Sequence, residues 1–190
     1  MPRDFVVTVM SVDRVGIVSG LSGAILDLGG NIDALSQTVM RGYFTLIATV
    51  QFDEERDREE IAEAVRREGP EGELGVLVKE RDLSAGQTAV VSDAERFILT
   101  MKGPDRKGIV RSITSYLASR NINIEDLYAA IEEEQFLLIA QLEVPPGLET
   151  ERLQLDVQEL WPGPDVKVSM QHENVFLATG NVEFSHTGAG

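Results

Sequence analysis

The sequence lacks several residue types on which common active sites depend. It has no cysteine among its 190 residues, which excludes disulfides and thiolate metal sites. Its two histidines, His172 and His186, lie in the C-terminal tail, so no Ser-His-Asp arrangement can form within the body of the chain. It also has no P-loop and no nucleophile elbow. The sequence therefore predicts no catalytic residues, no metal site and no cofactor.

Basic side chains and long apolar runs are also scarce. The formal net charge is −15, and residues 1–92 carry −7 (9 − 16) while residues 93–190 carry −8 (8 − 16). Nucleic-acid binding needs basic surface to neutralise phosphates, which neither half offers. No run of about 18 apolar residues exists to span a membrane, and the N-terminus lacks the apolar region of a secretory signal. We expect a cytoplasmic protein that binds neither nucleic acid nor membrane.

The chain contains an internal repeat. Residues 5–52 align without a gap with residues 97–144 at a constant offset of 92 (105 − 13 = 92), and fourteen of the 48 pairs are identical. Repeated leucine and isoleucine need only a repeated core. The repeated polar motif Asp-Arg-x-Gly-Ile-Val, at 13–18 and 105–110, and the later Asn-Ile, at 31–32 and 123–124, imply repeated loop geometry. A repeat of this length suits a duplicated small domain.

Apolar periodicity predicts the same element order in both repeats. In the first helix of repeat one, Gly29-Gly30 is the predicted stop, and Asn121 stops its copy. Arg41-Gly42 is the predicted hairpin turn, replaced in repeat two by three glutamates, 132–134. The predicted elements of repeat one are a strand over 5–11, a helix over 17–28, strands over 31–40 and 43–52, a helix over 53–68 and a strand over 74–78, with the final strand of repeat two over 166–170.

This β-α-β-β-α-β order is the split-βαβ, ferredoxin-like motif. The predicted class is α+β, with two domains in tandem and each antiparallel sheet carrying two helices on one face. Ile47 and Ile139 point to the outer faces, so we expect the open faces or edges to be covered by the other unit or by a second chain. The predicted domain boundaries are 1–82, a linker over 83–92, 93–172, and a C-terminal tail over 173–190. The apolar cluster Val175-Phe176-Leu177 in that tail either adds an edge strand or frays.

The repeated strand–helix loop is the candidate binding feature. A helix N-terminus offers free N–H groups and a positive dipole end, which suit a carboxylate. Gly16 and Gly108 have no Cβ and let a ligand approach the backbone. Asn31 and Asn123 open the second strand, where we expect them beside that loop, and a carboxamide can meet both groups of an amino acid. The structural alternative makes Asp13 and Asp105 helix N-caps, the glycines packing residues, and the asparagines left-handed turn residues.

These motifs resemble those of the ACT-domain family, which consists of small βαββαβ regulatory modules that commonly bind amino acids. The tandem arrangement is similar to that of two-ACT proteins related to the glycine cleavage system transcriptional repressor family. The sequence has Val15 and Lys107 where many relatives have proline before the motif glycine. The resemblance implies that a ligand lies between the strand–helix loop and the second strand, usually at an interface between two ACT units. The residues so implicated are Asp13, Gly16, Ile17, Asn31 and Ile32 in repeat one and Asp105, Gly108, Ile109, Asn123 and Ile124 in repeat two.

The expected function is therefore that of a non-catalytic regulatory protein. It would bind a small amino acid or related metabolite and act through a protein partner, with a homodimer among the expected assemblies. Two alternatives stay open: a structural ACT pair that binds no small ligand, and a detached regulatory part of an amino-acid or folate metabolic enzyme. If the protein affects transcription, its charge predicts an effect through protein contacts and not through DNA.

Overall fold

The computed structural model describes residues 3–82, 94–132 and 134–179. It contains two compact units, the first built from β1 to β4 and the second from β5 to α5. The predicted linker, 83–92, and the last part of the predicted tail, 180–190, lie outside the described residues. Within the described part of the chain, no helix has the length and apolar character needed to cross a membrane.

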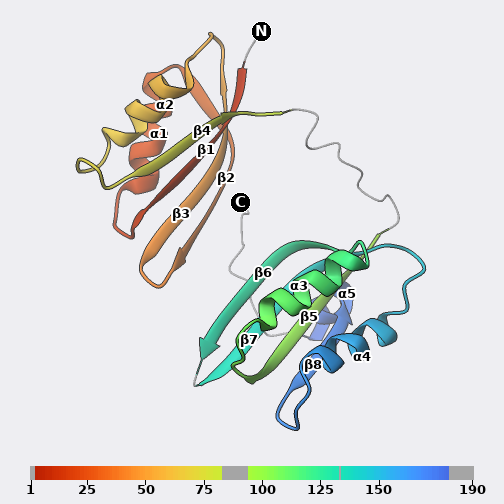
Figure 1. Cartoon of the computed structure of the whole chain (residues 1–190). Helices are drawn as coiled ribbons and strands as arrows, with labels where there is room; N and C mark the ends of the chain where they lie inside the picture. The colour runs from red at the N-terminus through yellow and green to blue at the C-terminus, as the bar shows by residue number, and fades with distance from the viewer. Residues whose placement is uncertain (1–2, 83–93, 133, 180–190) are drawn as a thin grey trace. The chain divides into compact units, whose positions relative to one another are not determined.

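The first unit has the predicted βαββαβ order (Figure 1). Its sheet is antiparallel with strand order β2-β3-β1-β4, so β2 and β4 form the edges. The helices α1 and α2 pack on one face of that sheet and contact each other. The elements are β1 (Arg3–Val12), α1 (Ile17–Asp27), β2 (Gly30–Met40), β3 (Tyr43–Phe52), α2 (Arg58–Arg66) and β4 (Gly75–Glu80).

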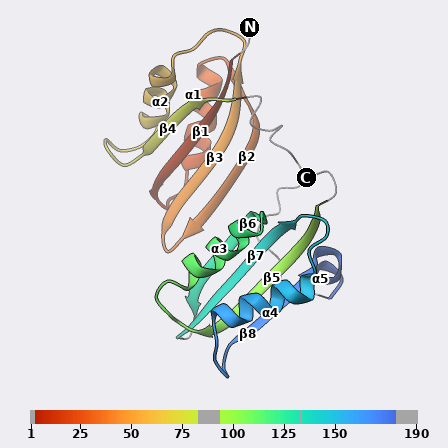
Figure 2. The same ribbon diagram turned by 45° about the vertical axis from the view of Figure 1, so that its right-hand side comes forward.

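The second unit repeats this architecture and adds a helix. Its strand order is β6-β7-β5-β8, and α3 and α4 lie on one face of the sheet (Figure 2). The added α5 contacts β5 and β8, and its Glu173 accepts a hydrogen bond from Gln141 on the outer face of β7 at 2.8 Å. The elements are β5 (Glu95–Pro104), α3 (Ile109–Ser119), β6 (Asn123–Glu132), β7 (Gln135–Val144), α4 (Thr150–Leu160), β8 (Lys167–His172) and α5 (Glu173–Thr179).

Each unit has its own core, made by alternate residues of the central strands. Successive side chains of a strand point to opposite faces, so every second residue meets the helices. In β1 these are Phe5, Val7 and Val9, all fully buried, and Leu21 and Ile25 of α1 cover them. Fully burying such a side chain contributes about 1.5–3 kcal/mol. The strand and helix periods read from the sequence are confirmed by this packing.

The ends of the first helix in each unit also follow the predicted chemistry. Gly29 follows α1 with φ of 75°, and Asn121 follows α3 with φ of 56°. These left-handed angles end a helix, and glycine and asparagine tolerate them best. The hairpin between β2 and β3 turns through Arg41 and Gly42, with φ of 50° and 82°, as a two-residue turn with the twist that paired strands favour.

Three sequence predictions need correction. The helix expected over 53–68 is shorter, because Asp57 caps it by accepting a hydrogen bond from the Glu59 N–H at 2.8 Å and α2 begins at Arg58. The segment Val175–Leu177 belongs to α5, so it neither adds a strand nor frays. His172, assigned to the tail, ends β8, where its ring contacts Phe97 edge-to-face at 5.3 Å between centroids.

Both edge strands β2 and β6 contain a bulge at the same place. Pairing with β3 shifts register between Ile32 and Ala34, which makes Asp33 the extra residue. Pairing with β7 shifts between Ile124 and Asp126, which makes Glu125 the extra residue. A bulge leaves one residue out of the ladder and increases the local twist. The duplicated domain has kept this irregularity, with an acidic residue in both copies.

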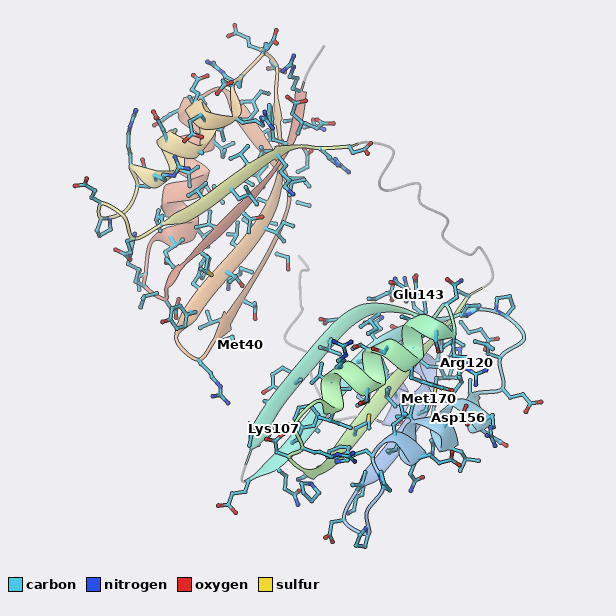
Figure 3. The ribbon with its side chains drawn as sticks, in the orientation of Figure 1. Met40, Lys107, Arg120, Glu143, Asp156 and Met170 are labelled. Carbon is cyan, nitrogen blue, oxygen red and sulfur yellow. The ribbon has the colours of Figure 1, made fainter. Side chains whose placement is uncertain are left out.

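A polar cluster joins the two helices of the second unit (Figure 3). The Tyr116 hydroxyl of α3 donates to Asp156 Oδ2 of α4 at 2.7 Å. Arg120 Nη2 also reaches Asp156 Oδ2, at 3.2 Å, and Arg152 Nε lies 2.8 Å from Asp156 Oδ1. Burial and the nearby Asp156 carboxylate raise the pKa of Tyr116. Asp156, which is 9% exposed, is thus a buried charge with several partners.

Asn121→Val is expected to destabilise the second unit by about 1–2 kcal/mol, because a β-branched residue tolerates a left-handed angle poorly. Asn121→Gly is the matched control and should change stability by less than about 0.5 kcal/mol. Urea unfolding followed by the fluorescence of Trp161 measures this, since Trp161 is the single tryptophan and is buried in this unit. Equal losses in the two variants would contradict the left-handed helix stop.

The raised pKa of Tyr116 makes the second unit sensitive to high pH. The folded state holds the phenol proton more tightly than the unfolded state, so this contribution to stability is complete below about pH 10 and is lost as pH rises through the folded pKa. Tyr116→Phe removes the titrating group. Unfolding curves of parent and variant, recorded from pH 8 to 12, should converge as pH rises, and parallel curves would contradict the assignment.

Candidate functional site

The strand–helix loop has the same backbone in both units. Gly16 precedes α1 with φ of 99°, and Gly108 precedes α3 with φ of 84°. Residues with a Cβ are strained at such angles. Space is not the constraint, because a Cβ at Gly16 would lie 4.0 Å from its nearest neighbour and a Cβ at Gly108 would meet nothing within 4 Å. The glycines are required for the backbone turn, and the alternative that they serve helix packing is wrong.

The motif aspartates do not cap these helices. Gly16 and Gly108 occupy the N-cap positions, and neither helix has a side-chain cap hydrogen bond. The alternative reading of Asp13 and Asp105 as N-caps is therefore wrong. Asp13 is held through its backbone, whose N–H donates to the Gly42 carbonyl at 2.9 Å. The first turn of neither helix contains an acidic residue, so the positive end of each helix dipole has no local acidic side chain to offset it.

The four isoleucines of the implicated set belong to the cores. Ile17 and Ile109, each 4% exposed, anchor the first turn of α1 and α3. Ile32 and Ile124 are half-buried and pack against the same two cores from the edge strands. Their side chains pack in or against the cores, so a ligand would contact their backbone groups.

Asn31 lies at the other end of the sheet from the Gly16 loop. Asn31 pairs with Gln51, which pairs with Asp4 near the start of β1, whereas the loop follows Val12 at the end of β1. Eight residues separate those two levels (12 − 4 = 8), which is about 26 Å at ~3.3 Å per residue. The expectation that the asparagine lies beside the loop is therefore wrong within one unit.

The second unit has the same separation. Figure 3 shows Lys107, within the Gly108 loop, and Glu143 at opposite ends of the unit. The Asn123 side-chain amide donates to Glu143 Oε2 at 2.9 Å, so Asn123 lies at the Glu143 end. Beside it, Arg96 lies 2.9 Å from Glu125 Oε1, and burial, partly offset by Arg96, raises the pKa of Glu125, with Glu143 adding to the rise. Asn123 is thus already engaged within a charged surface network.

A pocket of about 240 Å³ does adjoin the loop of the second unit. Pro104, at the end of β5, lines it together with Asp105 and Arg106 of the β5–α3 loop, and residues 161–166 line it from the turn between α4 and β8. Among the described residues, the Arg106 side chain makes no hydrogen bond or ion pair, while its carbonyl accepts a hydrogen bond from the Ile109 N–H at 3.2 Å. Of the ten implicated residues, only Asp105 lines this pocket.

At the corresponding place in the first unit, the arginine is paired. Arg14, the counterpart of Arg106, turns inward, and its Nε lies 2.7 Å from Glu73 Oε1. Gly69 provides the room, because a Cβ there would lie only 2.8 Å from Arg14 Nη2. A pocket of about 490 Å³ lies farther along this turn, between the end of α2 and Gly72, and no residue of the Asp13–Gly16 loop lines it.

The pocket turn was missed by sequence reasoning. The run Pro162-Gly163-Pro164 indicates a turn, and nothing in its composition indicates that the turn lines a pocket. A difference between the repeats could have indicated this pocket. Trp161 of repeat two occupies the position that corresponds to Gly69 of repeat one (161 − 92 = 69). A change of that size beside a shared motif indicates that the two loops have different surroundings.

Comparison with known proteins assigns the family. The ACT domain matches residues 3–79 and again residues 95–171. The chain belongs to the ACT-domain family. The ACT ranges differ by the same 92 residues as the internal repeat, so the duplicated domain is the ACT domain.

Curated relatives of this ACT protein are single-repeat in length. A UPF0237 protein of Streptococcus pneumoniae is 52% identical over 52 residues, which is 27% of this chain and 59% of the relative. A UPF0237 protein of Methanosarcina acetivorans is 40% identical over 86 residues, 44% of this chain and 91% of the relative. The first match thus spans less than two thirds of that relative's own length.

Two solved structures share the tandem fold. A protein of unknown function from Galdieria sulphuraria has a TM-score of 0.72 at 23% identity, covering 90% of this chain and 99% of its own. A candidate glycine cleavage system transcriptional repressor has a TM-score of 0.65 at 21% identity, covering 90% and 97%. At such identities the likeness concerns the ACT fold alone.

The Arg14–Glu73 pair is expected to stabilise the first ACT unit. Its side chains are 32% and 23% exposed, so the coupling energy should be about 1 kcal/mol, at the upper end for pairs near a surface. A double-mutant cycle with Arg14→Gln and Glu73→Gln measures it through native-state hydrogen exchange of β1 amides. The matched cycle, Arg106→Gln with Asp165→Asn, should give coupling near zero in β5. Equal coupling in both units would show that the second pocket closes in solution.

Proposed function

We propose that this protein is a non-catalytic regulator that binds a small amino acid through its ACT domains and acts through protein contacts. The observation that carries the proposal is the strand–helix loop, repeated in both ACT units, in which a left-handed glycine presents the start of a helix that has no acidic residue in its first turn. Free N–H groups and a positive dipole end favour a carboxylate. ACT domains commonly bind amino acids, which supports that ligand class.

The chemistry of the repeats supports regulation over catalysis. Neither ACT repeat has a cysteine, and the histidine at the end of β8 contacts Phe97 edge-to-face and accepts a hydrogen bond from the Asn174 N–H through Nδ1 at 3.2 Å. Among the described residues, no cluster of three His, Asp or Glu side chains is placed to hold a metal ion. The charged residues near the loops are arginine, lysine and aspartate, which can hold the two charges of an amino acid.

Regulation through a protein partner fits the charge better than regulation through nucleic acid. The chain carries −15 overall, and both halves are acidic. Such a protein repels a phosphate backbone. Ligand binding would instead shift the affinity for another protein or a second copy of the chain, which requires a ligand that distinguishes the two states.

A structural ACT pair without a small ligand is the second candidate. It is favoured by one observation: Asn123, implicated in ligand contact, already donates to Glu143. A thermal-shift screen against the twenty standard amino acids decides between the two. The regulator should show a midpoint that rises with the logarithm of the concentration of one amino acid or a chemically related few, as mass action requires.

The control for this screen is sodium chloride at matched ionic strength, because net charge alone makes stability respond to salt. A midpoint that responds equally to salt and to every amino acid would reject the regulator and leave the structural pair. Salt-sensitive binding of the purified protein to duplex DNA near neutral pH would overturn the mode of action.

A further inference from the structure

The two ACT units place an arginine and a carboxylate at equivalent positions but use them differently. Arg14 and Glu73 of the first unit correspond to Arg106 and Asp165 of the second (106 − 14 = 92; 165 − 73 = 92). In the first unit the two groups meet directly, with 2.7 Å between Arg14 Nε and Glu73 Oε1. In the second unit both line the open pocket of about 240 Å³ and make no ion pair with each other.

Residue 161 explains why the second pocket stays open. Trp161 is 2% exposed and packs edge-to-face on Phe136, with 5.7 Å between ring centroids. It therefore fills the space that Gly69 leaves to the guanidinium of Arg14 in the first unit. A Cβ on Gly103 would lie only 3.1 Å from Trp161 Cζ2, so glycine replaces the Ser11 of the first unit there. Excluded from this space, Arg106 remains exposed at the pocket.

The charges around this pocket match an amino acid. Arg106 offers a fork of donors suited to a carboxylate. Asp105 and Asp165 accept hydrogen bonds and attract an ammonium group. A volume of about 240 Å³ has room for a small metabolite.

Resting on the function proposed above, we infer that the amino-acid site is this pocket and that each chain has one such site, in the second ACT unit. The ligand is a free α-amino acid whose carboxylate meets Arg106 and whose ammonium meets Asp105 and Asp165. It inserts between the two groups that pair directly in the first unit. The first unit keeps the shared loop but pairs its arginine internally, through Arg14 Nε and Glu73, while Arg14 Nη2 is buried without a hydrogen-bond partner.

The fluorescence of Trp161 reports directly on this site, because Trp161 is the single tryptophan of the chain and lines the pocket. The full-length protein is titrated with each of the twenty standard amino acids while Trp161 fluorescence and binding heat are recorded. At least one amino acid should give a saturable fluorescence change, with a calorimetric stoichiometry of one per chain. Acetate and methylamine, which carry only one of the two charges, should bind at least about tenfold more weakly.

Variants locate the site. Arg106→Gln should weaken amino-acid binding by about tenfold or more, and Asp165→Asn, a second exposed change at the pocket, should weaken it too. Arg14→Gln is the matched control in the first unit and should bind like the parent. Far-UV circular dichroism verifies that each variant is folded.

Three outcomes would overturn the inference. If an amino acid binds by calorimetry but Arg106→Gln binds it as the parent does, the ligand lies elsewhere and the proposed function stands. If acetate binds as tightly as the amino acid, the pocket takes a simple anion. If none of the twenty amino acids binds by calorimetry, both the site and the proposed function are wrong.

Discussion

Each unit depends on the packing of two helices against one face of a four-stranded sheet. With no cysteine to form disulfides, burial of alternate strand residues beneath α1 and α2, or α3 and α4, supplies the main stabilising term. A helix that connects two strands on that face must return along the length of the sheet. The loop that starts the helix and the strand that follows it therefore lie at opposite ends. This constraint separates Gly16 from Asn31 and limits what one ACT unit can bind by itself.

The fold was accessible from the sequence because its signals are local and occur twice. Period-two burial in β3, the left-handed stop at Asn121 and the two-residue turn at Arg41-Gly42 each follow from chemistry within a few residues. The same element order in both copies supports each assignment, because a duplicated domain repeats its fold. The errors lie where a single side chain decides the boundary, as Asp57 does at the start of α2.

The candidate site was less accessible because it depends on residues that differ between the repeats. Identity between copies singled out Asp105 and Gly108, yet four of the ten implicated residues are core isoleucines. The feature that distinguishes the units is the exchange of Gly69 for Trp161, which redirects an arginine conserved in both copies. An alignment of the two repeats identifies the positions that are alike, so it does not single out such an exchange, although the effect of the exchange on packing is large.

The bulges in β2 and β6 bear on how a duplicated fold avoids mispairing and aggregation. Two similar sheets in one chain, each with a long edge strand, offer templates for mispairing between repeats and between molecules. Asp33 and Glu125 stand out of register on those edges, so a strand docking there would meet a twisted ladder and a carboxylate, which at Glu125 is paired with Arg96. An acid at the irregular point of both edges is the kind of feature that keeps an edge strand from pairing with other chains.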